Sequence, residues 1–249
     1  MTPPVFVAPP ALLRGACPGE VIRLTGAEGR HAATVRRLAP GEPVAVVDGE
    51  GARVTGTVAD VRGSSEIGVL VALVEREAIP DVPVTVVLAL LKGDRLESAV
   101  EMLTELGVDE IVPWSASRCI VQWRGERAAK GEQKVRAAAV AASKQSRRAR
   151  FPRIAQLAST DGVSTRLVAA ATVLVLHESA PLRLVDVERP GVGEIVLVIG
   201  PEGGLTAEEL AAFESVGGVA VRMGPTVQRA ATAAAAASSV ILARAGRWA

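Results

Sequence analysis

Aromatic residues are scarce in this chain of 249 residues, which contains no tyrosine, three phenylalanines and three tryptophans. An extensive stacking platform for the bases of a single-stranded nucleic acid is therefore not expected. Trp114 and Trp123 could still cover a base, although core packing or a subunit contact is the more common use of such side chains. Any recognition of nucleic acid is expected to depend mainly on shape and charge.

Cysteine and histidine are also scarce, with two residues of each type. Cys17 and Cys119 are too few for a disulfide framework, and we predict that both are reduced packing residues. With only His31 and His177, no metal-ligand cluster is expected. No apolar run approaches the roughly 18 residues of a membrane span, and residues 1–4 do not begin a signal peptide. The composition predicts a cytoplasmic protein without a metal site.

The most informative segment is an uninterrupted apolar run, Ile195 to Ile199, followed by a glycine-rich loop. The run is typical of a strand that is buried on both faces of a parallel sheet. Thr206 and Glu209 have the spacing of a capping box, which predicts a helix N-terminus at about Thr206. Since open parallel sheets bind ligands at the carboxyl ends of their strands, the loop 200–205 is predicted to line a pocket.

The charge of this loop limits the ligands that it could hold. The loop has no lysine, and it lacks the spacing of a P-loop or of a dinucleotide fingerprint. Glu202 would repel a pyrophosphate but would tolerate a neutral or cationic ligand. The alternative is a tight turn that binds nothing, because Gly-Pro and Gly-Gly pairs occur in many ordinary turns.

Two further predicted strands end in similar loops. Residues 219–223 precede the turn 224–226, and residues 171–176 precede the polar segment 177–179. Three such loops could line one pocket. The alanine-rich stretch 230–245 is predicted to be a helix, whose small side chains suit close approach to its own domain or to a second subunit. Alternatively, this helix has no special role.

The net charge of +1 conceals a basic segment between Arg118 and Arg153, where eleven lysines and arginines oppose only Glu126 and Glu132. A cluster of this kind neutralises phosphates and contributes a salt-dependent affinity for nucleic acid. The alternative is a solvated helix surface. Because the segment is so strongly of one sign, we favour contact with RNA.

The N-terminal part of the chain has a different pattern. Short apolar strands alternate with turns that contain Gly, Pro and Asp, as in a small β-barrel. The predicted strands are residues 21–24, 43–48, 52–58 and 67–73, with one helix at about 28–37. Pro80 and Pro83 indicate a linker, because proline cannot continue a strand ladder. We therefore predict a β domain at 1–76, a linker at 77–83 and a second domain at 84–249.

Six short motifs occur together and in order over about residues 80–245. They are Leu91 to Glu97, Leu103 to Val108, Gln145 to Arg147, Leu176 to Glu178, Val198 to Gly204, and Met223 to Pro225 with Arg229. In this combination the chain resembles the SPOUT superfamily of RNA methyltransferases and, within it, the ribosomal RNA small subunit methyltransferase E family.

The resemblance implies an α/β fold with a SPOUT-type parallel sheet and a C-terminal trefoil knot, preceded by a PUA-like β-barrel. Such a knot is an exception to the rule that chains do not thread through loops. The implied enzyme uses S-adenosylmethionine to methylate N3 of a specific uridine in small-subunit (16S) rRNA. A homodimer is expected, because SPOUT pockets are commonly completed by a second copy of the chain.

The resemblance also implies roles for particular residues. Arg229 would be catalytic, stabilising the negative charge that develops on a uracil oxygen. The implied cofactor-binding residues are Leu176, His177, Glu178, Ile199, Gly200, Pro201, Glu202, Gly203, Gly204, Met223, Gly224, Val227, Gln228 and Ala233. The residues indicated for RNA binding, by the resemblance and the basic segment together, are Arg30, Arg36, Arg37, Arg53, Lys92, Arg95, Lys144, Gln145, Arg147 and Arg148.

Two positions depart from the family pattern. Members usually carry an acid two residues after the motif's arginine, where this chain has Ala231, and a leucine where it has Gln228. Any role of that acid in orienting Arg229 must be filled elsewhere or is absent. Two alternatives therefore stay open: a non-catalytic knotted RNA-binding module, and a SPOUT methyltransferase that acts on another RNA position.

Overall fold

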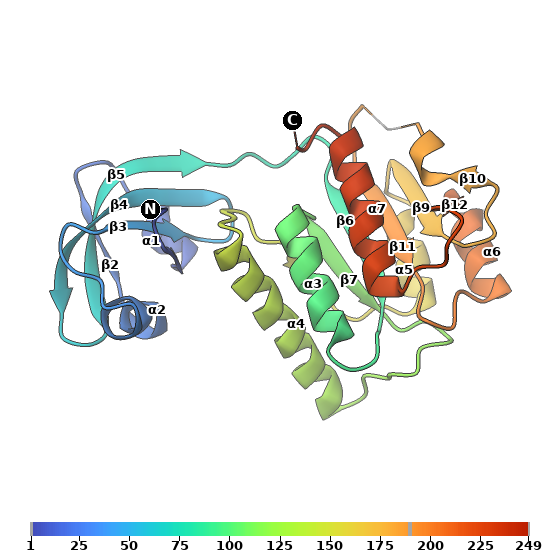
Figure 1. Ribbon diagram of the computed structural model, residues 1–249, viewed down its shortest axis with the longest axis horizontal. Helices are drawn as coiled ribbons and strands as arrows, with labels where there is room; N and C mark the ends of the chain where they lie inside the picture. The colour runs from blue at the N-terminus through green and yellow to red at the C-terminus, as the bar shows by residue number, and fades with distance from the viewer. Residues whose placement is uncertain (1, 189–190, 249) are drawn as a thin grey trace. The chain divides into compact units, whose positions relative to one another are not determined.

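The computed structural model describes residues 2–188 and 191–248 (Figure 1). The chain forms two compact units, each with its own hydrophobic core. The first unit comprises residues 1–78 together with 143–151, and the second comprises residues 79–142 together with 152–249. A segment from the middle of the sequence therefore packs with the N-terminal residues.

The first unit is a strongly curled five-stranded sheet (Figure 1). Its strands, in spatial order, are β1 (Val5–Val7), β3 (Pro43–Val47), β4 (Ala52–Arg62), β5 (Glu66–Arg76) and β2 (Val21–Leu24). Strand β1 pairs in parallel with β3, and the other pairs are antiparallel. The pairing of β4 with β5 shifts register at Thr55/Gly56, where a Cβ atom on Gly56 would collide with the Leu70 carbonyl oxygen. Such irregularities bend a strand and so favour a curled sheet.

The four predicted strands of this unit are confirmed, although β4 and β5 are longer than expected. The helix predicted at about 28–37 is wrong in its bounds and partly in its type. Helix α2 (Gly26–Arg30) is followed by a π-helical turn, η1 (His31–Val35), in which the Arg36 amide donates to the His31 carbonyl at 2.8 Å. Arg37 has a φ of 53°, so it cannot continue the helix. Strand β1 and helix α1 (Pro10–Arg14) were not predicted.

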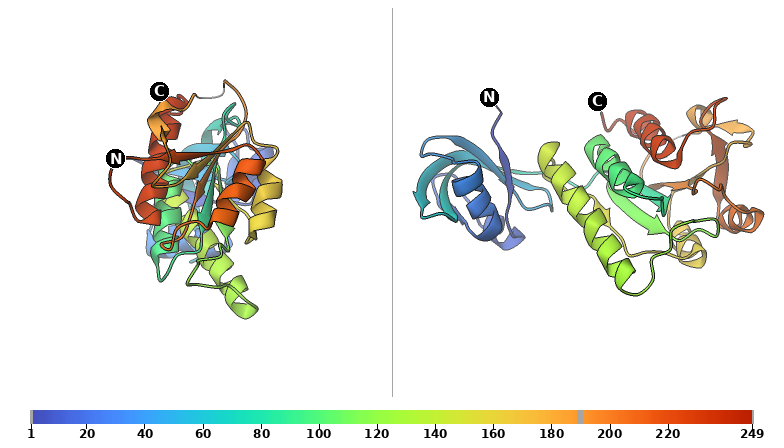
Figure 2. Two further views of the ribbon diagram at one scale, coloured as in Figure 1. Left: turned by 90° about the vertical axis from the view of Figure 1, so that its right-hand side faces the viewer. Right: turned by 60° about the horizontal axis from the view of Figure 1, so that its bottom comes forward.

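The second unit contains a seven-stranded sheet in which all strands are parallel. Its strands, in spatial order, are β10 (Leu182–Arg183), β12 (Gly218–Arg222), β9 (Thr172–Leu176), β11 (Ile195–Ile199), β6 (Val84–Ala89), β7 (Glu110–Trp114) and β8 (Arg153–Ile154). Helices α3 (Arg95–Leu106) and α7 (Ala230–Arg244) lie together on one face, and α5 (Thr160–Leu167) and α6 (Ala207–Ser215) cover the other (Figure 2). A short 3₁₀ turn, η2 (Leu184–Asp186), follows β10.

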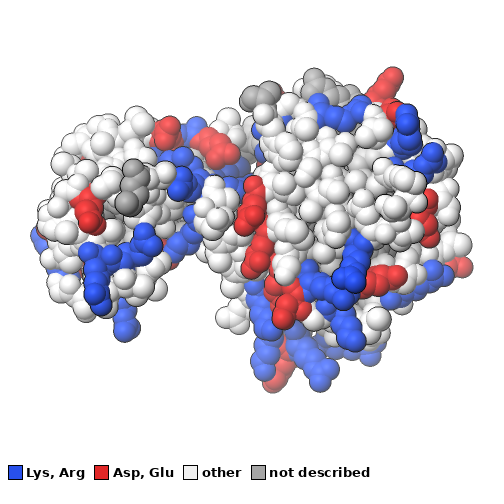
Figure 3. Space-filling model, in the orientation of Figure 1, with Lys and Arg blue, Asp and Glu red and all other residues white. Residues whose placement is uncertain are grey.

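The long helix α4 (Glu126–Gln145) carries much of the basic segment. Val135 and Ala139 are buried in the core of the second unit, whereas Arg127, Lys130 and Lys134 are exposed. In Figure 3, lysine and arginine side chains gather around the lower end of this helix, with a few acidic ones among them.

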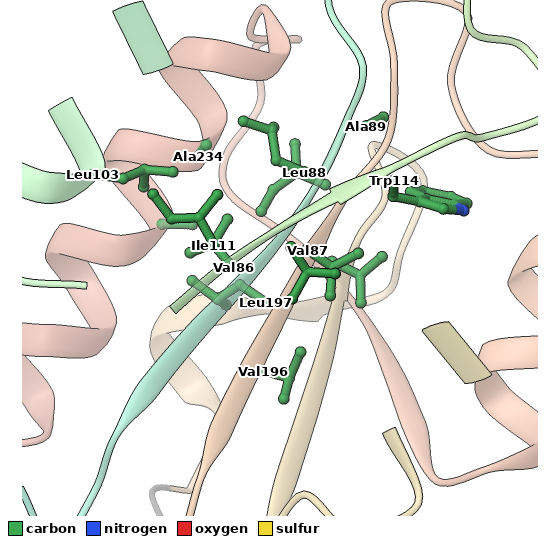
Figure 4. Packing of buried hydrophobic residues seen from close by; sticks show 14 of the residues in the cluster. Val86, Val87, Leu88, Ala89, Leu103, Ile111, Trp114, Val196, Leu197 and Ala234 are labelled. Carbon is green, nitrogen blue, oxygen red and sulfur yellow. The ribbon is translucent and has the colours of Figure 1, made fainter. Parts of the chain in front are cut away.

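The core of the second unit depends on strands that are buried on both faces. Every residue of β6 and of β11 is buried, as predicted for the run Ile195 to Ile199. The close view in Figure 4 shows Val86, Leu197 and their neighbours packed below Leu103 and Ala234. Ala234 is fully buried on α7, so the alanine-rich helix approaches α3 and the sheet of its own unit closely.

Two predictions about single residues have different outcomes. Trp114 is fully buried and makes an edge contact with Phe213, with ring centroids 5.3 Å apart, so its use is core packing. Cys119 is buried, but the prediction that Cys17 is a packing residue is wrong, because Cys17 is exposed in the turn before β2. In the described part of the chain, no helix is long and apolar enough to cross a membrane.

We predict that Leu197→Ala lowers the free energy of unfolding of the second unit by about 2–5 kcal/mol, because it leaves a cavity in a fully buried strand. Trp114, Trp123 and Trp248 all lie in this unit and the chain has no tyrosine, so tryptophan fluorescence during urea denaturation reports on it alone. The control is Val219→Ala, at a side chain that is 44% exposed. Equal losses for the two variants would contradict the prediction.

Candidate functional site

Three neighbouring strands of the parallel sheet end at the same edge. Because β9, β11 and β12 are adjacent and parallel, the loops that follow Leu176, Ile199 and Arg222 meet there. A cavity of about 420 Å³ lies between these loops. The prediction that the three loops line one pocket is confirmed.

The cavity brings together Arg229 and all fourteen residues that the sequence indicated for the cofactor. Fourteen of the lining residues are Leu176, His177, Glu178, Ile199, Gly200, Pro201, Glu202, Gly203, Gly204, Met223, Gly224, Val227, Gln228 and Ala233. Of the five other lining residues, Leu205 and Thr226 belong to loops that were predicted to line the pocket, whereas Arg118, Val221 and Ala230 were not predicted. The most polar of these, Arg118, lies in the loop after β7. This loop has no glycine-rich segment from which a ligand loop could have been predicted.

The glycine loop is a tight turn. The Gly204 amide donates to the Pro201 carbonyl at 2.9 Å, and Gly204 has a φ of +70°, in the left-handed region. Glycine adopts this conformation without the steric cost that a Cβ atom would add. Gly200, Gly203 and Gly204 can therefore offer only backbone groups to the cavity that they line.

Arg118 holds the glycine loop from outside the turn. One nitrogen of its guanidinium, Nη1, donates to the Gly203 carbonyl at 3.0 Å and to the Leu205 carbonyl at 3.1 Å. A Cβ atom on Gly203 would lie 3.0 Å from the Arg118 Cβ atom, so the two segments are in close contact. The position of the loop thus depends on a residue 85 positions earlier in the sequence.

The helix after the loop begins as predicted. The Thr206 hydroxyl accepts from the Glu209 amide at 3.1 Å, and the Glu209 carboxylate accepts from the Thr206 amide at 2.9 Å. This capping box is extended, because the buried Glu209 also accepts from the Ser117 amide at 2.7 Å. One carboxylate therefore fixes the start of α6 and the segment that carries Arg118. Beside it, burial raises the pKa of the Cys119 thiol, which keeps this side chain neutral at pH 7.

An ion pair lies at the rim of the cavity. Arg95, at the start of α3, and Glu202, in the glycine loop, approach to 3.2 Å between Nη1 and Oε1. Both residues line a second, smaller cavity of about 160 Å³, together with Leu91, Arg229, Ala230, Ala231 and Thr232. Ala231, the position that departs from the family pattern, thus faces this second cavity. Lys92 is exposed in the preceding loop.

One polar atom of the first cavity has no partner among the described residues. The side-chain oxygen of Gln228 is buried and accepts no hydrogen bond. Among residues 2–188 and 191–248, no group of three or more His, Cys, Asp or Glu side chains could hold a metal ion.

Most of the residues predicted to bind RNA lie in the first unit. Arg30, Arg36, Arg37, Gln145 and Arg147 are exposed there. Three others have internal contacts: the Arg53 guanidinium donates to the Arg147 carbonyl, Arg148 donates to the Arg150 carbonyl, and Lys144 bonds both oxygens of Glu28. Lys144, at 2.8 and 2.9 Å from those oxygens, also lies over the Phe6 ring. Lys144 thus anchors the segment 143–151 to the N-terminal sheet.

Comparisons with known proteins agree with this geometry. A family model described as an RNA methyltransferase domain matches residues 78–242, and one described as an RNA methyltransferase PUA domain matches residues 24–70. The ribosomal RNA small subunit methyltransferase E of Mycobacterium bovis is 44% identical over 236 residues, which cover 92% of this chain and 89% of the relative. The corresponding protein of Bacillus subtilis is 25% identical over 225 residues, covering 88% of each chain.

Solved structures give the same result. The ribosomal RNA small subunit methyltransferase E of Neisseria gonorrhoeae, bound to S-adenosyl methionine, has a TM-score of 0.83 and 25% identity, over 98% of each chain. A protein of Legionella pneumophila described as a methyltransferase, in complex with the cofactor SAM, has a TM-score of 0.85 and 27% identity, also over 98% of each. Both the parallel sheet and the curled N-terminal sheet are thus shared with these proteins. The identity to the Mycobacterium bovis relative over nearly the whole chain, and the domain match over residues 78–242, show that this chain belongs to the ribosomal RNA small subunit methyltransferase E family.

Proposed function

We propose that this chain transfers the methyl group of S-adenosylmethionine to N3 of a specific uridine in small-subunit (16S) rRNA. The observation that carries the proposal is the cavity at the ends of β9, β11 and β12, in which all the residues implied for the cofactor lie together with Arg229. Family membership and the two cofactor-bound structures that resemble this chain support the same conclusion.

The residues of the cavity suit this cofactor. Leu176, Ile199 and Met223 offer apolar contacts to a flat ring, and the glycine loop offers backbone groups. Glu178 and Glu202 suit the positive charges of the cofactor. The bound cofactor supplies an already activated methyl group, so the chain has to position the base and help N3 to lose its proton.

Arg229 is suited to the second of these tasks. When N3 loses its proton, negative charge develops on the uracil oxygens, and a fixed guanidinium stabilises that charge. Arg229 is the N-cap residue of α7, and no side chain caps this helix. The positive end of the helix dipole therefore acts on the same region as the arginine.

The proposal includes three properties that follow from the family: a trefoil knot in the C-terminal region, a homodimer, and a cytoplasmic location beside the ribosomal substrate. Val227, which lines the cavity, is 81% exposed, which suits a face that a second copy of the chain covers. A ribosome-binding module without methyl transfer remains the second candidate. The observation that favours it is Ala231, which brings no carboxylate to the smaller cavity beside Arg229.

Incubation of the protein with S-adenosylmethionine and small subunits that lack the modification is expected to produce 3-methyluridine. The product is measured by mass spectrometry of nucleosides from the digested rRNA, with Arg229→Ala as the control. Absence of any methylated nucleoside while S-adenosylmethionine still binds would establish the binding module instead. A methylated nucleoside other than 3-methyluridine would assign the activity to another position.

Arg229→Ala should lower kcat by about 10²- to 10³-fold, the usual effect of removing a group that stabilises developing charge. The dissociation constant for S-adenosylmethionine, measured by calorimetry, should stay within about twofold of that of the wild type, because the side chain acts on the base. Arg183→Ala, at an exposed arginine outside both cavities, should leave both quantities unchanged. A normal kcat for Arg229→Ala would remove the residue from the mechanism.

Gly204→Ala should weaken the binding of S-adenosylmethionine about tenfold or more, because a residue with a Cβ atom resists a φ of +70° and shifts the turn. Gly217→Ala is the matched control, since Gly217 has a φ of +92° at the end of α6, outside both cavities. Both variants should lose about 1–2 kcal/mol of stability. Only Gly204→Ala should change the calorimetric affinity, and equal affinities would contradict the role of the turn.

A further inference from the structure

The second, smaller cavity is a separate space that adjoins the first. It lies between the loop after β6, the start of α3, the glycine loop and the first turn of α7. Glu202, Arg229 and Ala230 line both cavities, so the two spaces meet at these residues. Leu91, Arg95, Ala231 and Thr232 line the second cavity and not the first. A ligand there would lie directly beside a cofactor in the larger cavity.

The lining of the second cavity combines apolar walls with the guanidinium groups of Arg95 and Arg229, and its other polar residues are Glu202 and Thr232. Leu91 is buried, and Ala230 and Ala231 add only methyl groups, so the walls suit the faces of a small flat ring. Arg95 and Arg229 are both donors and can never accept a hydrogen bond. The ion pair with Glu202 restricts the direction of the Arg95 guanidinium.

A ring with two carbonyl oxygens matches this arrangement. Uracil carries O2 and O4 on either side of N3, so two donors can bind both oxygens and leave the N3 edge turned toward the larger cavity. Cytosine carries an amino group in place of O4. This amino group would face a guanidinium, and because both groups are hydrogen-bond donors, no hydrogen bond could form between them. A site that is built to hydrogen-bond one group discriminates strongly against an analogue that lacks it.

We propose that the second cavity holds the target uracil base, with Arg95 and Arg229 donating to its two carbonyl oxygens. The inference rests on the proposed function and deepens it, because it assigns the recognition of the base to Arg95 and gives Ala231 a reason to be small. Glu202 is a positioning residue that fixes Arg95. Both guanidinium groups then stabilise the charge that spreads over O2 and O4 when N3 loses its proton.

The first test removes the donor that belongs to the second cavity alone. Arg95→Ala should lower kcat/KM for methylation of unmodified small subunits by about ten- to hundredfold, the cost of a hydrogen bond to a charged donor. The dissociation constant for S-adenosylmethionine should not change, which also shows that the variant is folded. Arg95→Lys should recover only part of the activity, because it cannot reproduce the planar guanidinium. The control is Arg183→Ala, which removes the arginine of a comparable exposed ion pair with Asp186.

The second test fills the cavity. Ala231→Leu should reduce methylation by about a hundredfold or more, since the base is excluded, while S-adenosylmethionine still binds. Ala235→Leu is the matched control, one turn further along α7, also half-buried and outside both cavities. Small subunits with cytidine in place of the target uridine should yield no 3-methylcytidine. The cytidine substrate is tested with the wild-type protein. It therefore shows whether the second cavity selects uracil even if Ala231→Leu fails to fold.

Different outcomes overturn the proposed function and the assignment of the second cavity. If the wild-type protein makes no 3-methyluridine, the proposed function fails. If it does, but Arg95→Ala and Ala231→Leu match the wild type, or cytidine is methylated equally well, the assignment of the second cavity is overturned. A loss of cofactor affinity that parallels the loss of turnover would also overturn it, because the second cavity would then belong to the cofactor.

Discussion

The site depends above all on the parallel pairing of β9, β11 and β12. Their hydrogen-bonded register brings three strand ends to one edge, and helices on both faces leave that edge as the place where a ligand can reach the backbone. The five residues of β11 are fully covered, so the strand has no freedom to slide. A shift of one residue would bring Glu194 or Gly200 into the buried strand and would also move the glycine loop out of the cavity.

The order of the strand ends is not sufficient, because a glycine-rich loop needs outside support to keep one shape. Two residues provide it, Arg118 by donating to loop carbonyls and Glu209 by accepting from the amides of Ser117 and Thr206. The loop can therefore be rigid although its sequence is flexible, and preorganised backbone groups lose less entropy on binding.

Local signals were enough to predict strands β9, β11 and β12, the capping box at Thr206 and the three loops at the sheet edge. What the sequence could not reveal were contacts between distant residues. Lys144 lies in a basic segment that favoured RNA binding, yet it pairs with Glu28, 116 positions away, and so holds the segment 143–151 to the N-terminal sheet. Arg118 belongs to the same basic segment and likewise bonds a distant loop. Charge patterns in a sequence do not distinguish a cation facing solvent from one that is bound internally.

The position of Glu202 explains how the chain can have Ala231 where the family pattern has an acid. An acid at position 231 would have stood in the smaller cavity beside Arg229, whereas here the carboxylate lining that cavity belongs to Glu202, and its partner is Arg95. The methyl group of Ala231 fills little of the smaller cavity. It also cannot accept a hydrogen bond from the Arg229 guanidinium, as a carboxylate at this position could. A guanidinium that is not already engaged with a carboxylate can give all its hydrogen bonds to a developing oxyanion. The loss of the motif's acid is therefore compatible with the proposed catalysis, in which Glu202 and Arg95 would orient the base and Arg229 would stabilise its charge.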